Sequence, residues 1–458
     1  MRVQHLFYST NAERQTLHRR ITPTAEQREQ QQNRWNDLRD YLIGDLTEKT
    51  GLVISSWLQG SYKFGTQVRP VAGGEFDIDL GIYLNWAGRA EEGPYAPSQI
   101  KQLIQSALEA YANEADEEVI EVIQPPKERC SRIRFTGNFH IDVPSYHLDP
   151  DADLRSLATE TKGWEESDPK AFYVWFRDQF DEDDHAQVRR LIRYFKMWGA
   201  LNLEKCLPSV VMTVLVAEAF TDLSDGELES DDLAIRNIAA SIAARLDIDP
   251  RVPNPVATDE NLNRLGAEET MRVIAGLQEL TATADLALGA PTEADTAVHW
   301  SSVFHHFFPA PEQAANAMDQ NALVPVAFDP QVRVEATPSS GTHTFVSTNR
   351  IGPIPKRCSI TFTLLNAVDL PAGAQVRWIV RNEGEEAELT NDLGHRAGEG
   401  FQTNENSAYR GTHYMDVMVL SMFGAVLGFR RIPVEISGLP MPARNPKRPG
   451  WTRFRGRR

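Results

Sequence analysis

The chain has 458 residues, of which 41% are apolar and 24% charged, and its 47 basic and 64 acidic side chains give a formal net charge of −17. This length accommodates about two to three domains of ~150 residues, which excludes a single small binding module. The acidic balance repels nucleic-acid phosphates at long range, so duplex binding by the surface as a whole is disfavoured.

Membrane and secreted classes are disfavoured as well. No apolar run approaches the ~18–20 residues that cross a bilayer, and the polar segment from Met1 to Arg20 lacks the apolar centre of a signal peptide. The three cysteines, Cys130, Cys206 and Cys358, are too few for a disulfide framework or a CxxC zinc cluster. We therefore expect a cytoplasmic protein with no membrane partner.

Residues 1–150 predict an α/β core with a long opening helix. Residues 23–50 are rich in helix formers, with Leu38, Leu42 and Leu46 on one face and Gly51 as a stop signal. Short apolar runs separated by helical patterns follow, as in a small mixed sheet flanked by helices. These runs lie at 52–58, 76–84 and 133–143.

The remaining chain changes character twice. Helical periodicity dominates 151–309, which we expect to be the helical half of the same fold. Prolines then interrupt the pattern, and we place a linker at 310–338. Residues 339–438 alternate apolar and polar side chains between turns, the pattern of an Ig-like β-sandwich. The basic segment 439–458 is expected to be disordered. The predicted fold class is α+β.

The most informative stretch begins where an apolar strand runs into Gly60 and Ser61. Gly60 lets the backbone approach a phosphate closely, and Ser61 can cap the helix-compatible segment that follows, whose free N–H groups attract an anion. A Gly-Ser pair alone is also a commonplace turn. The acidic residues further along the chain help to distinguish a phosphate-binding turn from an ordinary one.

Three acids follow on two predicted strands. Asp77 and Asp79 alternate with apolar residues, so both project from one face of a strand. Asp142 lies in the second strand of a predicted hairpin that turns at 136–138. Carboxylates this close repel one another, and a hard divalent cation such as Mg²⁺ offsets the repulsion most simply. In the alternative interpretation, Asp142 is a solvated strand residue and the other two belong to a turn.

Together, the segments GSYKFGTQVRP, EFDIDLGIYL and HIDVPSY resemble the nucleotidyltransferase fold of DNA polymerase beta. Over roughly residues 1–310, the sequence is more closely similar to the bacterial cyclic-nucleotide synthases related to cyclic GMP-AMP synthase and oligoadenylate synthase. The resemblance implies that Gly60 and Ser61 hold the donor triphosphate. It implies that Asp77 and Asp79 bind two Mg²⁺ ions, with Mn²⁺ as a substitute. Asp142 would bind one of these ions and help to deprotonate the acceptor hydroxyl.

Cationic residues on a later helix are further candidates. Arg189, Arg193 and Lys196 share one helical face by their spacing, which is typical either of a phosphate-binding stripe or of a solvated face. The resemblance assigns Lys196 to the triphosphate. It also implies that Ser209, at the start of the next helix, makes a second phosphate contact.

The β-rich C-terminal part resembles the AGS-C type of sensor domain that is fused to such synthases. Trp378, Tyr409 and Tyr414 could stack on a base, with Arg396 and Arg410 near a phosphate. Alternatively, these residues are sandwich core and surface. A ligand of this domain is therefore one predicted partner.

The resemblance implies a magnesium-dependent nucleotidyltransferase that joins NTPs, such as ATP or GTP, into a cyclic or short linear oligonucleotide. This second messenger would serve antiphage defence of the CBASS type by switching on a separately encoded effector. Two alternatives stay open. One is template-free addition of nucleotides to RNA ends or of AMP to a protein, and the other is a catalytically vestigial nucleotide or nucleic-acid sensor. The sequence does not reveal the bases, the linkage or the product size.

Overall fold

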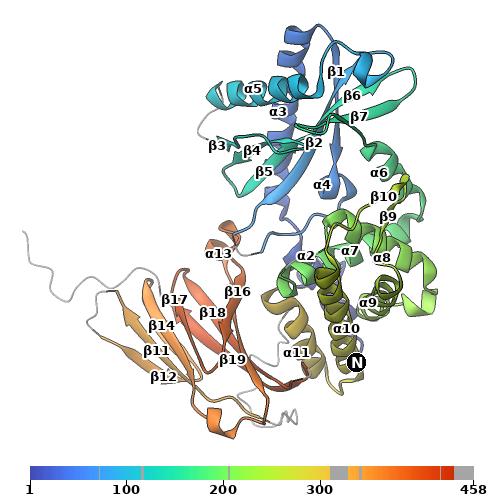
Figure 1. Cartoon of the computed structure of the whole chain (residues 1–458). Helices are drawn as coiled ribbons and strands as arrows, with labels where there is room; N and C mark the ends of the chain where they lie inside the picture. Colours follow the sequence, from blue (N-terminus) through green and yellow to red (C-terminus); the bar gives the residue numbers. More distant parts are fainter. Residues whose placement is uncertain are drawn as a thin grey trace, which may run out of the picture. The chain divides into compact units, whose positions relative to one another are not determined.

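The computed structural model describes residues 1–71, 73–114, 118–204, 207–309, 328–339, 343–422 and 424–437 (Figure 1). The chain divides into two compact units, Arg2–Leu288 and Gly289–Arg458, with Met1 assigned to the second. Among the described residues, no helix combines the length and the apolar character that a bilayer crossing needs.

The first unit opens with helices α1 (Gln4–Phe7), α2 (Leu17–Ile21) and α3 (Ala25–Thr50). Helix α3 is the predicted opening helix. It begins at a capping box in which Thr24 and Gln27 satisfy each other's backbone N–H groups, and it ends at Gly51, whose φ of 69° is left-handed. Its leucines at 38, 42 and 46 are fully buried.

A mixed sheet follows, and two helices pack on it. The strands are β1 (Val53–Gln59), β2 (Phe76–Asn85), β3 (Val119–Val122), β4 (Ser131–Phe135), β5 (Phe139–Val143), β6 (Ser145–Asp149), β7 (Leu154–Ala158) and β8 (Trp164–Glu166), in the order β3-β4-β5-β2-β6-β7-β8 with β1 also paired to β2. Between β1 and β2 lies the short helix α4 (Gly60–Phe64), and η1 (Ala90–Glu92) precedes α5 (Pro97–Glu114). Apolar residues of α3, α5 and β2 form one core cluster.

Strand β2 holds the centre of this sheet. Its first residues pair in parallel with β5, and its last residues pair in parallel with β6. Pro144 separates β5 from β6, and its carbonyl accepts a hydrogen bond from the Ile82 amide of β2 at 3.0 Å. Proline lacks the N–H that a continuous ladder would use. The two short strands therefore run along β2 as one interrupted strand.

The predicted helical half is present. It contains α6 (Pro169–Asp178), α7 (Glu182–Asn202), α8 (Ser209–Asp222), η2 (Asp225–Glu227), α9 (Asp231–Ile248) and α10 (Ala267–Gly289). A small hairpin of β9 (Pro253–Asn254) and β10 (Ala257–Asn261) interrupts the helices and was not predicted.

The second unit begins with α11 (Glu293–Phe304) and η3 (His305–Phe307) and continues as a β-sandwich. One sheet has the order β12-β11-β14-β17, and the other has the order β13-β19-β18-β15-β16. The strands are β11 (Val332–Pro338), β12 (Phe345–Thr348), β13 (Ile351–Ile354), β14 (Cys358–Leu364), β15 (Gln375–Arg381), β16 (Gly394–Glu399), β17 (Gln402–Asn406), β18 (Gly411–Leu420) and β19 (Val426–Ile436), with η4 (Ala367–Asp369) and α13 (Glu385–Leu389) between them. Apolar side chains from both sheets share one core, which confirms the predicted α+β class.

Two expected boundaries need correction. Strand β11 starts inside the stretch expected to be linker, because Val332, Val334 and Ala336 alternate into the sandwich core. Helix α11 and η3, expected in the helical half, lie in the compact unit of the sandwich. The Arg381 guanidinium on β15 donates to the carbonyl of His305 at 2.8 Å and so ties this segment to the sandwich. Residues 310–327 and the basic segment 439–458 lie outside the described residues.

Candidate functional site

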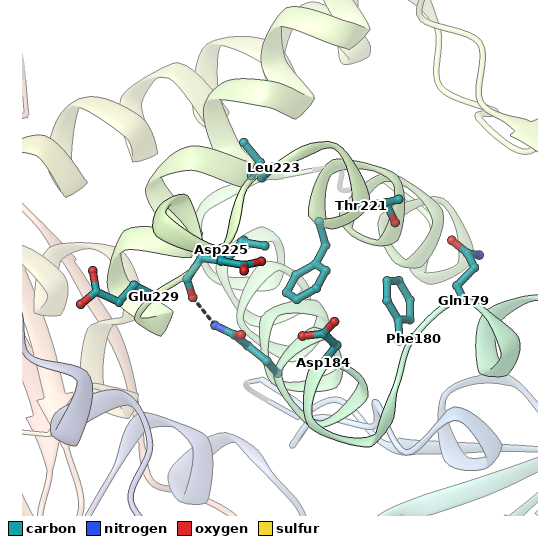
Figure 2. A pocket seen from close by; sticks show the side chains of 10 residues that line it. Gln179, Phe180, Asp184, Thr221, Leu223, Asp225 and Glu229 are labelled. Carbon is teal, nitrogen blue, oxygen red and sulfur yellow. Dashed lines mark hydrogen bonds between the residues drawn. The ribbon is translucent and has the colours of Figure 1, made fainter.

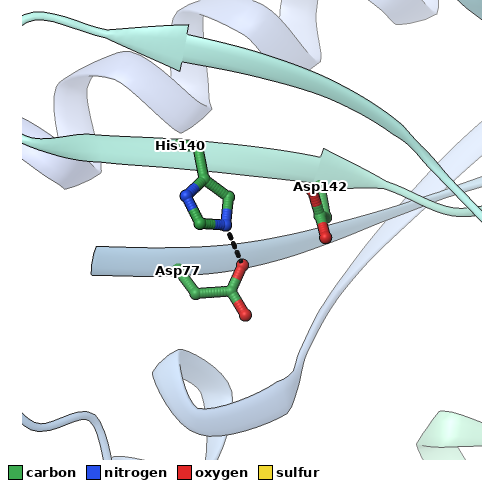
Figure 3. Close-up of side chains that lie close together, drawn as sticks. All are labelled: Asp77, His140 and Asp142. Carbon is green, nitrogen blue, oxygen red and sulfur yellow. Dashed lines mark ion pairs between the residues drawn. The ribbon is translucent and has the colours of Figure 1, made fainter. Parts of the chain in front are cut away.

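The three predicted acids lie on adjacent parallel strands. In the pairing of β2 with β5, Asp77 is opposite His140 and Asp79 is opposite Asp142. The apolar residues of both strands face the core between sheet and helices, so the acids project from the other face. Figure 3 shows Asp77 on β2 directed toward the residues of β5. The structure therefore brings the three carboxylates together.

His140 is a member of this site that sequence reasoning missed. Oxygen or nitrogen atoms of Asp77, His140 and Asp142 all lie within 4.8 Å of one another, close enough to share a metal ion. The His140 ring joins Asp77 Oδ1 at 2.9 Å through Nε2 and Glu75 Oε2 at 2.9 Å through Nδ1 (Figure 3). His140 and Asp142 are two residues apart on one strand, and this spacing indicates that both side chains project from the same face. The histidine thus links Asp77 to a second carboxylate behind it.

Asp79 is the acid that lies against the Gly60 turn. Burial, followed by the negative charges of Asp77 and Asp142, raises the pKa of Asp79 well above its usual value. Gly60 packs directly against this carboxylate, because Gln59 is opposite Asp79 in the β1–β2 pairing and Gly60 follows it. A carboxylate in this environment favours either a proton or a cation.

Asp142 is held by two cations on its own side of the sheet. Arg132, directly opposite on β4, donates to both carboxylate oxygens at 2.5 and 2.7 Å, and Lys127 Nζ lies 3.5 Å from Oδ2. Burial acts to raise the pKa of Asp142, but hydrogen bonding and charge from Arg132 outweigh it and lower the pKa. In a hairpin that turns at 136–138, Arg132 lies opposite Asp142, so the sequence contained the signal for this pair.

The predicted phosphate-binding residues form the turn from β1 into α4. Gly60 has a φ of 59°, and Ser61 is the second residue of the helix. The Ser61 carbonyl accepts from the Thr66 amide at 2.9 Å, and Gly65 ends the helix in a left-handed conformation. The segment 60–66 is thus a compact loop beside Asp79.

The cationic face of α7 lies against this loop. Lys196 is 9% exposed and donates to Thr66 Oγ1 at 3.1 Å, and the Arg193 guanidinium donates to the Gly65 carbonyl. Arg189 also lies beside Gly65. Burial and then the charge of Arg193 lower the pKa of Lys196 to about 7. Since these side chains contact the loop, the alternative of a fully solvated face is wrong.

Comparison with known proteins identifies the family of this chain. Residues 55–146 match the family described as cyclic GMP-AMP synthase DncV-like, nucleotidyltransferase domain. A curated relative, the cyclic GMP-AMP synthase of Escherichia albertii, is 30% identical over 459 residues, which cover 98% of each chain. The chain belongs to the DncV-like nucleotidyltransferase family. It is an enzyme of this type, as the resemblance in the sequence implied.

Other comparisons agree with this family. A c-di-GMP synthase of Roseivirga ehrenbergii is 25% identical over 297 residues, 56% of this chain and 74% of the relative. The fold is shared with Vibrio cholerae DncV bound to 3'-deoxy ATP, at a TM-score of 0.58 and 20% identity over 67% of this chain and 96% of that one. Escherichia coli DncV bound to 3'-deoxy GTP has a TM-score of 0.55 and 17% identity over 65% and 95%. Residues 313–437 match the adenylyl/guanylyl and SMODS C-terminal sensor domain.

Ser209, the last of the predicted phosphate-binding residues, lies at the start of a helix in this DncV-like chain. It is the exposed first residue of α8, and its carbonyl accepts from the Thr213 hydroxyl at 2.9 Å. Among the described residues, no hydrogen bond joins its side chain to Lys196 or to the loop. Its phosphate contact therefore stays a prediction.

One cavity of the first unit is separate from the acids. It has a volume of about 450 Å³ and lies between the ends of α6 and α8 and the start of α7 (Figure 2). Its walls include Phe180, Phe220, Asp184 and Asp225, and none of the predicted site residues lines it. The predicted site residues lie instead where β2, β5 and the loop 60–66 meet.

The C-terminal candidates separate into core and surface. Trp378 is fully buried between the sheets and donates to the Gly400 carbonyl at 2.8 Å, so its proposed stacking on a base is wrong. Arg396 pairs with Glu399. Tyr409 and Tyr414 are partly exposed and line a smaller cavity.

Proposed function

We propose that this chain uses Mg²⁺ to join NTPs into a cyclic or short linear oligonucleotide. The observation that carries the proposal is the convergence of Asp77, Asp79 and Asp142 beside the Gly60–Ser61 turn. The two curated relatives compared above are named as synthases of cyclic dinucleotides. The DncV structures bound to ATP and GTP analogues support ATP and GTP as its substrates.

The acidic residues fit a pair of divalent cations. Carboxylate oxygens are the ligands that Mg²⁺ prefers, and burial together with the charges of Asp77 and Asp142 disfavours an ionised Asp79 that has no cation beside it. Asp77 and Asp79 would hold both ions, and Asp142 would hold one. When bound, two such ions activate the attacking hydroxyl and stabilise the leaving pyrophosphate.

The residues of the chain arrange the substrates around that centre. In the reaction, the acceptor 2'- or 3'-hydroxyl oxygen bonds to the α-phosphorus of the donor, and the bond from that phosphorus to the pyrophosphate oxygen breaks. Asp142 receives the hydroxyl proton once Arg132 has released one of its oxygens. Lys196, with a pKa of about 7, becomes fully charged beside a triphosphate and offsets its negative charge.

The biological setting is part of the same proposal. The pairing of a DncV-like core with a sensor domain supports a signalling enzyme whose product acts elsewhere. We place it in the cytoplasm, where NTPs are available, and in antiphage defence, where a separately encoded effector would bind the product. Ser209 and the Gly60–Ser61 turn would both hold the donor triphosphate.

The test is product formation from labelled NTPs. Full-length protein with ATP, GTP and Mg²⁺ is expected to release pyrophosphate and give a phosphatase-resistant small product, identified by mass spectrometry. The double variant Asp77→Asn with Asp79→Asn should lose at least ~10²–10³-fold in rate. Asp151→Asn, an exposed residue beyond β6, is the matched control. Label that stays on RNA or protein, or equal rates in the double variant, would refute the proposal.

A further inference from the structure

The sandwich contains a cavity of about 210 Å³ that no activity of the core explains. It lies at one end of the sandwich, between the sheets, where β16 of one sheet and β17 of the other approach. Its floor is apolar and includes Phe362, Val380, Met415 and Ile436. Small-molecule cavities commonly measure ~300–1,000 Å³, so this one accommodates a single ring system rather than a whole nucleotide.

The rim of the cavity is polar and acidic. Asp392, His395, Glu405, Tyr409 and Tyr414 all line it. Among the described lining residues, none is lysine or arginine. The acidic side chains of the rim therefore disfavour a phosphate inside this cavity, and the predicted phosphate contacts of Arg396 and Arg410 stay predictions.

The carboxylates of the rim are fixed but not saturated. Tyr409 donates to Asp392 Oδ2 at 2.8 Å, and His395 Nε2 joins Glu405 Oε1 at 2.9 Å. Each contact uses one of the roughly four lone pairs of its carboxylate, so both oxygens can still accept hydrogen bonds from a ligand. An ionised carboxylate only accepts hydrogen bonds, so the ligand must present N–H or O–H donors.

Aromatic rings supply the remaining walls. The His413 ring is fixed in a neutral form, because its Nε2 contacts the Tyr409 carbonyl at 2.9 Å and its Nδ1 accepts from the Glu383 amide at 3.3 Å. Burial lowers the pKa of His413. Tyr409 packs beside it with ring centres 6.2 Å apart. The two ring planes are inclined by 48°, so a planar heterocycle can stack on one of them.

We propose that this cavity binds a guanine base, presented by a free nucleoside or nucleotide, with its N–H edge on Asp392. Guanine offers adjacent ring and amino N–H donors on one edge, the pattern that one carboxylate accepts. Adenine lacks that pair of donors. The base enters and the sugar stays at the rim, so a 5'-phosphate adds little to the affinity. This ligand is independent of the NTPs consumed by the core.

The binding experiment uses the full-length chain and compares guanosine, inosine, adenosine and GMP by calorimetry. Guanosine should bind at least about ten-fold more tightly than adenosine, the size of one hydrogen bond to a charged group. Inosine, which lacks the amino group, should fall between them, and GMP should match guanosine. Equal affinity for adenosine, or no guanosine binding, overturns the proposal. Much tighter GMP binding does so as well.

Location is tested by photocrosslinking with 8-azidoguanosine and by two variants. Crosslinks are expected in 392–415, and crosslinks found only in 60–85 would assign the guanosine to the core instead. Asp392→Asn keeps an acceptor for Tyr409 and should weaken binding about ten-fold. Asp369→Asn, exposed on η4 outside the cavity, is the matched control. Ala408→Trp, on the exposed rim, should block the cavity without removing any contact. Unchanged binding in both variants overturns the assignment.

Discussion

The carboxylate of Asp79 occupies the space that a side chain on Gly60 would need. A Cβ at Gly60 would lie 1.9 Å from Asp79 Oδ2, far inside van der Waals contact. The φ of 59° at Gly60 is also one that other L-residues adopt only with strain. Glycine is therefore required here by its neighbour and by its backbone, before any phosphate is considered.

Gly60→Ala should displace Asp79 and lower the rate of pyrophosphate release by about 10²-fold, because shifts near 1 Å at a catalytic group have effects of that size. Circular dichroism checks that the variant chain stays folded. Gly44→Ala on α3 is the control, because no atom lies within 4 Å of its added Cβ. Wild-type rates in Gly60→Ala would mean that Asp79 moves aside freely.

Arg132→Gln should reduce the Mg²⁺ concentration that gives half-maximal rate. Arg132 now competes with a metal ion for both oxygens of Asp142. Loss of a partly exposed ion pair of about 1 kcal/mol corresponds to about five-fold in metal affinity. Mn²⁺ binding followed by electron paramagnetic resonance measures this separately from turnover. Lys127→Gln should change the Mg²⁺ requirement less than Arg132→Gln does. A higher Mg²⁺ requirement in Arg132→Gln would show that Arg132 orients Asp142 instead of competing with the metal ion.

Acid should destabilise the chain through His18. Burial, then the charges of Arg193 and Arg190, lower the pKa of His18 to about 3. Below a pH of about 6.5 the unfolded chain takes up a proton that the folded chain does not bind until about pH 3. Stability is therefore lost as the pH falls through this window, by about 2 kcal/mol between pH 7 and pH 5.

His18→Gln tests this contribution, because glutamine stays neutral and can still accept the Arg193 hydrogen bond that now measures 3.0 Å. Urea denaturation at pH 7 and pH 5 should show a difference in unfolding free energy that is smaller by about 2 kcal/mol than in wild type. His343→Gln, at an exposed position, is the control. The same pH dependence in wild type and His18→Gln would assign the effect to other groups.

Arg381→Met should destabilise the second unit by about 3–5 kcal/mol. The guanidinium is 2% exposed, pairs with the buried Asp416 and donates to the carbonyls of His306 and Phe308 at 3.0 and 2.6 Å. Arg333→Met, which removes an exposed ion pair, should cost less than about 1 kcal/mol. Urea midpoints of the two variants compare these costs. Equal midpoints would show that the carbonyls find other donors.

The local chemistry of the site could be predicted because it depends on short-range alternation. Asp77 and Asp79 share a face by the two-residue period of a strand, and the Gly-Ser turn follows directly from an apolar run. The pairing of Asp142 with Arg132 follows from counting residues outward from the hairpin turn. The contact of His140 with Asp77, by contrast, depends on which strand becomes the neighbour of β2. That pairing is long-range and leaves no local mark in the sequence.

The spacing of Arg189, Arg193 and Lys196 predicted a common face but not what that face contacts. The position of α11 was predicted wrongly for a related reason. Its apolar residues, such as Trp300 and Phe304, require burial, and periodicity cannot tell which of two neighbouring bodies buries them. Arg381 binds this segment to the sandwich through backbone carbonyls, and because every residue has a carbonyl, the sequence does not reveal this contact.

The interrupted strand formed by β5 and β6 limits how the coding sequence can change in length. One residue inserted between Phe139 and Asp142 would turn Asp142 toward the core, because neighbouring side chains of a strand point to opposite faces. An insertion in the turn at 136–138 would leave the β2–β5 register intact. Length variation among descendants of this gene should therefore collect in that turn and be absent from the four codons that follow it.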